Sequence, residues 1–196
     1  MTRTVFTARR PMAAVLALVA GTLAPPAVAQ EVLTARLDFF GRDGVPAGTG
    51  TASALPVGVL FEIEVRGLTG NSWVAVHVHE TGSCDPAGGH ESAGGHFNPA
   101  DTPHGYRSAG GPHAGDLPNQ YVPADGILRA QIFAPLLTLG SGAADVRGRA
   151  LIVHAGPDDY QSQPSGGAGD RLACAPITWP ILTYSPTLTP ISERWP

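Results

Sequence analysis

The feature that most constrains this chain is a long stretch, residues 82–121, with too few apolar side chains to form a core. Its central part, HESAGGHFNPADTPHGYRSAGGPHAGD (residues 90–116), is made largely of glycine, proline and small polar residues and holds four of the seven histidines. A loop of this length and composition does not become ordered by itself. Either it is disordered and its histidines are accidental, or something binds the histidines and holds the loop.

The rest of the chain offers a scaffold of short strands and no convincing helix. In one segment, Val59, Phe61, Ile63 and Val65 share a face while glutamates occupy the other. Such segments, separated by turn sequences, are residues 32–40, 57–65, 73–79, 126–134, 149–154 and 171–177. We expect an all-β fold, an antiparallel Greek-key β-sandwich or flattened barrel of the immunoglobulin-like kind, with two long functional loops at 82–121 and 155–170.

The first 29 residues predict a signal peptide. Arg3, Arg9 and Arg10 precede the apolar run MAAVLALVAGTLA, which is too short to span a bilayer and leads to the small residues AVA before Gln30. A membrane anchor is the alternative, and the lack of a cysteine after the run argues against a lipid anchor. We therefore expect a secreted protein located in the periplasm, with no membrane anchor.

The mature chain is acidic and contains no lysine. Loss of the three N-terminal arginines leaves nine arginines against sixteen acids, a net charge of about −7. Such a surface argues against nucleic acid or an anionic membrane as partner. The remaining length suits one domain, which we place at residues 30–177, followed by a proline-rich tail, residues 178–196, that we expect to be extended and loosely held. The sequence leaves monomer and homodimer open.

Cys84 and Cys174 are the only cysteines. In an exported protein, two cysteines far apart in sequence are most simply explained by a disulfide. Two free thiols or two thiolate metal ligands remain as alternatives.

Two histidines share one face of a predicted strand. In WVAVHVH (residues 73–79), His77 and His79 alternate with valines. The valines are expected to face the core, so both imidazoles project outward. Two imidazoles side by side form half of the square-planar nitrogen site that Cu(II) prefers. An isolated pair would more often be exposed surface histidines, but His154, at the end of another strand, could reach the same face.

The histidine-rich loop offers a second set of metal ligands. His96, His104, His113 and Asp116 follow one another at intervals of eight, nine and three residues. Three imidazoles and a carboxylate suit tetrahedral zinc. A closed site of this kind would order the loop, because its binding energy becomes folding energy. The metal would replace the core that the loop lacks.

In this order and spacing, these residues resemble the copper/zinc superoxide dismutases, in particular the exported bacterial type. The resemblance runs from about Trp73 to Ile177, with weaker similarity from Val32. The matching stretches are HVHETGSC (77–84), GGHFNP (94–99), HG (104–105), HAGDLPN (113–119), GRALIVHAGPDD (148–159) and GAGDRLAC (167–174).

The resemblance implies one copper ion and one zinc ion per subunit, which convert superoxide to oxygen and hydrogen peroxide. It assigns His96 to both metals, as a bridge between them. Its copper ligands are His77, His79, His96 and His154, and its zinc ligands are His96, His104, His113 and Asp116.

The resemblance also implies roles for residues that bind no metal. Arg171 matches the arginine that holds the superoxide anion beside copper. Asp158 matches the carboxylate that links a copper histidine to a zinc histidine. Cys84 and Cys174 match the disulfide of the family.

Some residues depart from the family pattern. Val74 and Ala75 stand where the family usually has histidine and glycine, so we expect different local packing. Asp170 directly precedes Arg171, and we expect it to pair with the guanidinium and weaken anion docking. His90 matches no ligand, which predicts a solvated loop histidine. The alternative function is a non-enzymatic periplasmic copper/zinc-binding or copper-buffering protein on the same scaffold.

Overall fold

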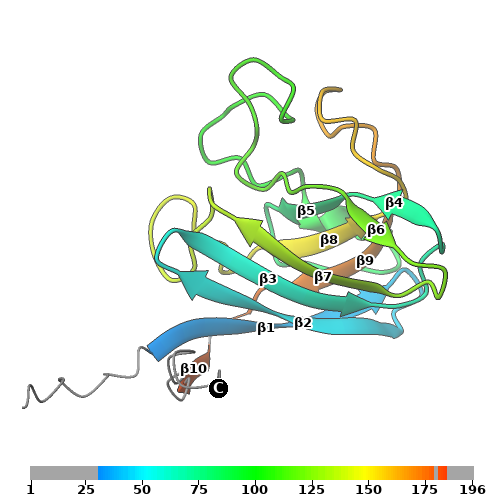
Figure 1. Ribbon diagram of the computed structural model, residues 1–196, viewed down its shortest axis with the longest axis horizontal. Helices are drawn as coiled ribbons and strands as arrows, with labels where there is room; N and C mark the ends of the chain where they lie inside the picture. Colours follow the sequence, from blue (N-terminus) through cyan, green and yellow to red (C-terminus); the bar gives the residue numbers. More distant parts are fainter. Residues whose placement is uncertain (1–30, 179–180, 185–196) are drawn as a thin grey trace, which may run out of the picture.

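The computed structural model describes residues 31–178 and 181–184 (Figure 1). The described part contains ten strands and one short 3₁₀ helix, η1 (Glu91–Ala93). The strands are β1 (Glu31–Gly41), β2 (Pro46–Leu55), β3 (Gly58–Val65), β4 (Ser72–Val74), β5 (Val76–His79), β6 (Gln120–Val122), β7 (Leu128–Ala134), β8 (Ala150–His154), β9 (Arg171–Pro176) and β10 (Ile181–Tyr184). No helix among these residues is long and apolar enough to cross a membrane.

The strands form one large antiparallel sheet that curls on itself. Its order is β5-β8-β9-β1-β2-β3-β7, and β10 also pairs with β1. A second, two-stranded sheet joins β4 to β6, which contacts β7 at the far end of the large sheet. Both long loops rise from the same end of the curled sheet (Figure 1). The prediction of an all-β antiparallel fold with two long loops is confirmed.

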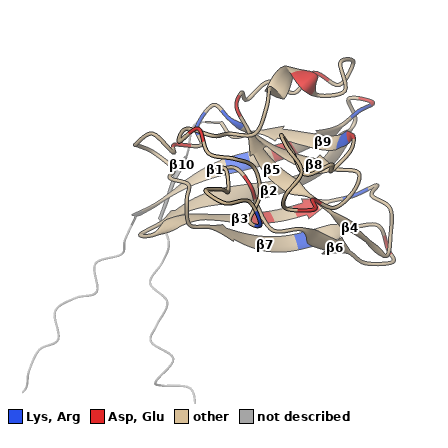
Figure 2. Ribbon diagram, turned by 90° about the horizontal axis from the view of Figure 1, so that it is seen from above, with Lys and Arg blue, Asp and Glu red and all other residues tan. Residues whose placement is uncertain are grey.

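The interior of the curl is filled by the apolar side chains that the alternation predicts. Val59, Phe61, Ile63 and Val65 of β3 are all buried, and Glu62 between them is exposed. The outer face of this region is charged: Figure 2 shows acidic residues on β3 and a basic residue on β7. A hydrophobic inside and a polar outside are typical of an antiparallel sheet with one solvated face.

Strand β2 is a long element that the sequence pattern does not predict. Its sequence, PAGTGTASAL, has few large apolar residues, yet it pairs over most of its length with both β1 and β3. Its glycines allow the neighbouring backbone to approach: a Cβ on Gly48 would lie 2.1 Å from the Glu64 carbonyl oxygen, and one on Gly50 would lie 2.5 Å from that of Glu62. Small residues here serve close strand contact.

The predicted strand at residues 73–79 is divided in two at Ala75. The Ala75 N–H donates to the Gly156 carbonyl (2.8 Å), and its carbonyl accepts the His154 N–H (2.9 Å). The backbone therefore changes partners at this point, between β4 and β5. Val74 remains in the core despite its departure from the family pattern.

Part of the C-terminal tail joins the sheet. Residues 181–184 form β10 and pair antiparallel with Glu31–Thr34 of β1. The expectation of a loosely held tail is therefore wrong for this segment. The predicted signal peptide and the rest of the tail lie outside the described residues.

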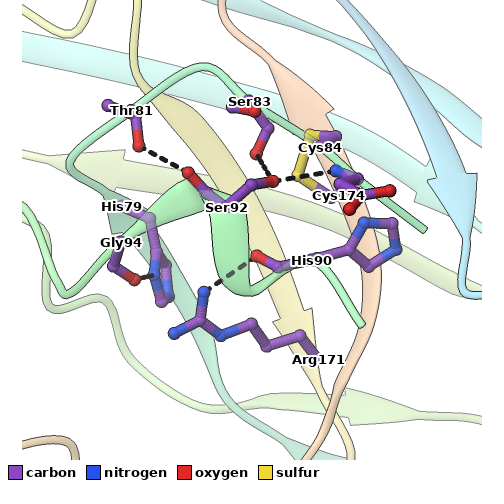
Figure 3. The surroundings of a disulfide bond; sticks show 10 residues. His79, Thr81, Ser83, Cys84, His90, Ser92, Gly94, Arg171 and Cys174 are labelled. Atoms are coloured by element: carbon purple, nitrogen blue, oxygen red, sulfur yellow. Dashed lines mark hydrogen bonds between the residues drawn. A yellow bond between two sulfur atoms is a disulfide. The ribbon is translucent and has the colours of Figure 1, made fainter. Parts of the chain in front are cut away.

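A disulfide between Cys84 and Cys174 ties the start of the first long loop to β9 (Figure 3). The loop around it is held by Ser92, whose hydroxyl donates to the Ser83 carbonyl (3.0 Å) and accepts the Asp85 N–H (2.9 Å). This outcome confirms the simplest interpretation of the two cysteines.

Replacing Cys84 with serine should lower the free energy of unfolding by about 4–5 kcal/mol, because the bond closes a loop of 90 residues that would otherwise be free in the unfolded chain. Denaturant titration under non-reducing conditions measures the loss. Reduced wild-type protein should match the variant. A variant as stable as the oxidised wild type would contradict this account.

Candidate metal centre

The free edge of β5 holds the histidine-rich loop in place. Val78 donates its N–H to the Gly115 carbonyl (2.9 Å) and accepts the Phe97 N–H (2.8 Å). In this register His77 lies opposite Asp116, and His79 lies opposite His96. Backbone pairing thus places loop residues beside the two strand histidines.

The first group of side chains is His77, His79, His96 and His154, as predicted for copper. One ring nitrogen from each can be chosen so that all four lie within 4.8 Å of one another. Nε2 of His79 lies 3.3 Å from Nε2 of His154, across the pairing of β5 with β8. All four are buried, which corrects one expectation: His77 and His79 leave the core face, but the loops cover them.

The second group is His96, His104, His113 and Asp116, as predicted for zinc. Nδ1 of His96 lies 2.8 Å from one oxygen of Asp116, and Nδ1 of His104 lies 3.0 Å from the other. Nδ1 of His113 is 3.3 Å from the first oxygen. His96 belongs to both groups, with Nδ1 toward Asp116 and Nε2 on its other side.

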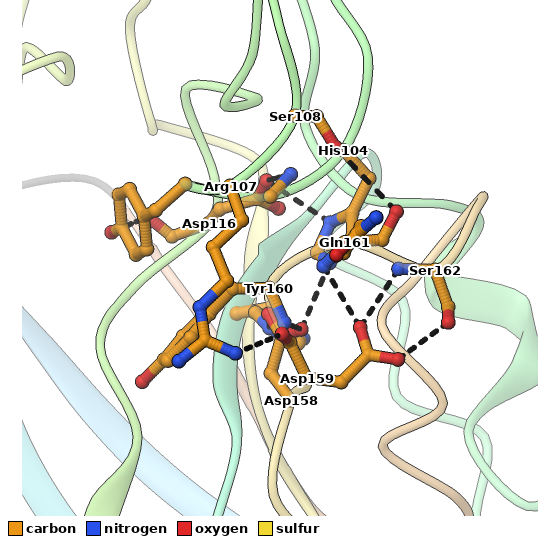
Figure 4. Close-up of polar contacts among 12 residues, drawn as sticks. His104, Arg107, Ser108, Asp116, Asp158, Asp159, Tyr160, Gln161 and Ser162 are labelled. Carbon is orange, nitrogen blue, oxygen red and sulfur yellow. Dashed lines mark hydrogen bonds and ion pairs between the residues drawn. The ribbon is translucent and has the colours of Figure 1, made fainter.

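Asp158 contacts one histidine of each group. One carboxylate oxygen accepts from Nε2 of His77 (3.1 Å), and the other accepts from Nε2 of His104 (3.0 Å). The Tyr160 N–H (2.6 Å) fixes the same carboxylate from the second long loop (Figure 4). Asp158, the residue that the sequence predicts as the linking carboxylate, therefore contacts one histidine of each group.

Outer acceptors fix which nitrogen of each ring faces inward. The carbonyls of Gly94 and Gly169 accept from Nδ1 of His79 (2.9 Å) and Nδ1 of His154 (3.3 Å). Each of these rings therefore turns a bare Nε2 inward. Asp158 accepts from Nε2 of His77 and of His104, so these two rings turn Nδ1 inward. Metal-binding histidines in proteins are typically oriented by such outer partners.

Several inward nitrogens have no hydrogen-bond partner within the described residues. They are Nδ1 of His77, Nε2 of His96, Nδ1 of His104 and Nδ1 of His113. An unpaired buried polar atom is costly and rare in proteins, unless an ion or a water molecule satisfies it. These four atoms point into the two groups, so the residues present fit one metal ion in each.

Burial keeps three histidines of the first group neutral. It lowers the pKa of His77 to about 4, of His79 to about 2 and of His154 to about 3. Neutral imidazole is the form that binds metal, so these rings are ready at neutral pH.

His104 behaves differently. Burial favours its neutral form, but the carboxylates of Asp116 and Asp158, each 3.0 Å from a ring nitrogen, outweigh burial and raise its pKa to about 9. Contacts with histidines likewise outweigh the effect of burial on the two carboxyls and hold their pKa values below the usual range. A zinc ion bound here must displace a proton from His104.

Arg171 lies beside the first group. It lines an open cavity of about 420 Å³ together with His79, His96 and His154. Its Nη1 donates to the His90 carbonyl (2.9 Å), and its Nη2 lies 3.2 Å from the Glu91 carboxylate. Asp170 turns away and pairs with Arg42 (2.5 Å), so the expectation that it pairs with Arg171 is wrong.

His90 is buried, contrary to the expectation of a solvated histidine. Its backbone is in the left-handed region (φ 64°), and its N–H donates to the Asp85 carbonyl (2.8 Å). This turn carries the ring inward beside the disulfide (Figure 3). A loop residue that follows two glycines and precedes a glutamate carries no pattern from which such burial could be predicted.

Comparison with known proteins agrees with this geometry. A model of the family "Copper/zinc superoxide dismutase" matches residues 48–177. The chain belongs to the copper/zinc superoxide dismutase family. Curated superoxide dismutases [Cu-Zn] are 40% identical over 154 residues in Aquifex aeolicus (76% of this chain, 90% of the relative) and 43% identical over 141 residues in Caulobacter vibrioides (69% and 80%).

Solved structures of superoxide dismutases and related proteins share its fold. A superoxide dismutase-like protein from Bacillus subtilis is 32% identical with a TM-score of 0.70, and the match covers 74% of this chain and 99% of that one. The Cu/Zn superoxide dismutase of Brucella abortus is 33% identical with a TM-score of 0.62 and the same coverage.

The family resemblance predicted from the sequence is confirmed, and with it superoxide dismutase activity and the use of copper and zinc. The alternative of a non-enzymatic metal-binding protein is not favoured, because curated relatives are superoxide dismutases and both ligand groups are complete.

Replacing Gly166 with alanine should weaken zinc binding by about 10- to 100-fold, as loss of an outer partner typically does. A Cβ there would lie 1.8 Å from the Asp158 carboxylate and 2.7 Å from Nε2 of His104. Competition with a chromophoric chelator measures the affinity. Gly167→Ala is the matched control, since φ is +65° there against +69° at Gly166, but nothing lies within 4 Å. Equal losses in both variants would assign the effect to backbone strain instead.

Proposed function

We propose that this superoxide dismutase holds copper on His77, His79, His96 and His154 and zinc on His96, His104, His113 and Asp116. The observation that carries the assignment is the set of buried nitrogens without a hydrogen-bond partner that face inward; on His77, His96 and His104 the other ring nitrogen contacts a carboxylate. His96 supports it most strongly, because its two nitrogens face the two different groups.

Copper, when bound, supplies one-electron redox chemistry that oxidises one superoxide to oxygen and reduces the next to peroxide, while zinc supplies a fixed charge without redox chemistry. The chain's own part is to position groups and move protons. His96 lines the cavity and its buried Nε2 has no protein partner, so this nitrogen is suited to take up a proton and pass it to the reduced product. Asp158 keeps the rings of both groups in one orientation.

Arg171 is proposed to dock the superoxide anion. Its guanidinium is permanently charged and fork-shaped, and the cavity that it lines also exposes histidines of the copper group. The backbone carbonyl of His90 fixes one end of the fork, which leaves the other end toward the cavity.

Two substitutions separate the roles of the metals. His154→Ala should abolish copper-dependent dismutation and leave zinc binding and most of the fold intact. Asp116→Ala should weaken zinc binding by more than the roughly 10- to 100-fold caused by losing an outer partner. Elemental analysis and superoxide decay after pulse radiolysis give both readouts on each variant. Full activity in His154→Ala would show that the copper assignment is wrong.

We further propose that the chain is exported to the periplasm, with residues 1–29 as the signal peptide, residues 30–177 as the superoxide dismutase domain and residues 178–196 as a tail. The Cys84–Cys174 disulfide supports export, because disulfides persist in oxidising compartments.

Protein recovered from the periplasmic fraction should have the intact mass of a chain that begins at Gln30. This mass is expected because cleavage after AVA leaves Gln30 as the first residue. A cytoplasmic protein that retains its N-terminal residues would contradict the proposal.

A further inference from the structure

Glu91 and Arg171 form an ion pair at the cavity over the copper group. The Glu91 carboxylate lies 3.2 Å from Nη2 of Arg171, and both residues line the cavity. The glutamate side chain is 74% exposed, whereas that of the arginine is only 14% exposed. The acid can therefore swing into solvent, while the guanidinium stays where it is.

The two ends of the guanidinium are held differently. Nη1 donates to the backbone carbonyl of His90, which also accepts the Ala93 N–H and is fixed by the turn of η1 (Figure 3). Nη2 pairs with the largely exposed carboxylate of the next residue, Glu91. Nη2 is thus the end at which one anion can exchange for another.

Neighbouring acids are engaged elsewhere. Asp170 pairs with Arg42, and Glu80 accepts the Gly95 N–H (2.9 Å). Among the described residues, Glu91 is the acid within ion-pair distance of Arg171.

We propose that Glu91 is a built-in competitor for the anion site on Arg171. Its carboxylate occupies Nη2 between turnovers, and superoxide or another small anion binds there only after displacing it. The inference rests on the proposed role of Arg171. Since exposed ion pairs are weak and screened by salt, the carboxylate should weaken anion binding by only about two- to fivefold.

Azide is a suitable probe, because it is a small anion whose binding changes the absorption of protein-bound Cu(II). In protein loaded with copper and zinc at low ionic strength, Glu91→Gln should lower the dissociation constant of azide by about two- to fivefold. The rate of superoxide decay should rise in the same variant. Glu62→Gln is the control: it removes the same charge from an exposed position on β3, away from the cavity.

The sign of the effect separates competition from a structural role. If Glu91 served to hold Arg171 in place, its replacement would weaken azide binding. An azide affinity in Glu91→Gln that is equal to or lower than in Glu62→Gln overturns the proposal.

Arg171→Gln distinguishes failure of this proposal from failure of the proposed anion site. If Arg171→Gln weakens azide binding and Glu91→Gln does not strengthen it, only the role of Glu91 is wrong. If Arg171→Gln leaves azide binding unchanged, the anion site is wrong and the role of Glu91 falls with it. A variant that combines Glu91→Gln with Arg171→Gln should bind azide no more tightly than Arg171→Gln alone, because the guanidinium for which Glu91 competes is then absent.

Discussion

The register between the edge of β5 and the loop beside it places His77 and His79 opposite Asp116 and His96, so that residues of both side-chain groups meet. An end strand leaves unpaired N–H and C=O groups, and here Gly95, Phe97 and Gly115 pair with them. Because side chains alternate along a strand, a shift of one residue would turn His77 and His79 to the wrong face. The observed register sets the zinc carboxylate and the shared histidine directly across from them.

Asp158 is one of several residues that attach the second long loop, together with Tyr160 and Gln163. Asp158 receives hydrogen bonds from His77 on the strand and His104 in the first loop, and its own backbone exchanges two bonds with the Asn119 side chain. Neither loop is built around a sizeable apolar core of its own. Buried polar groups are stable only when all of them are satisfied, so the loops and the metal site order together.

The sequence predicts the parts of this protein that obey short periodic rules. The alternation in β3 and the pair His77 and His79 can be identified because strand side chains repeat every two residues. The loop ligands can be identified from their spacing and their resemblance to the family. Strand β2 cannot be predicted, because its small residues are selected by close backbone contact with two neighbours and not by burial of large apolar groups. The burial of His90 depends on a left-handed turn beside the disulfide, which no local pattern encodes.

The pairing of Asp170 illustrates the same limit and leaves Arg171 available for the proposed anion site. Sequence neighbours in an extended chain project to opposite sides, so Asp170 and Arg171 diverge, and the acid meets Arg42 in the turn after β1. The charge beside the copper group is then set by contacts between distant segments: a loop carbonyl on one end of Arg171 and a loop carboxylate on the other. The chain has no lysine to attract anions from a distance, so under the proposed role of Arg171 the charges in contact with this guanidinium would govern how superoxide binds.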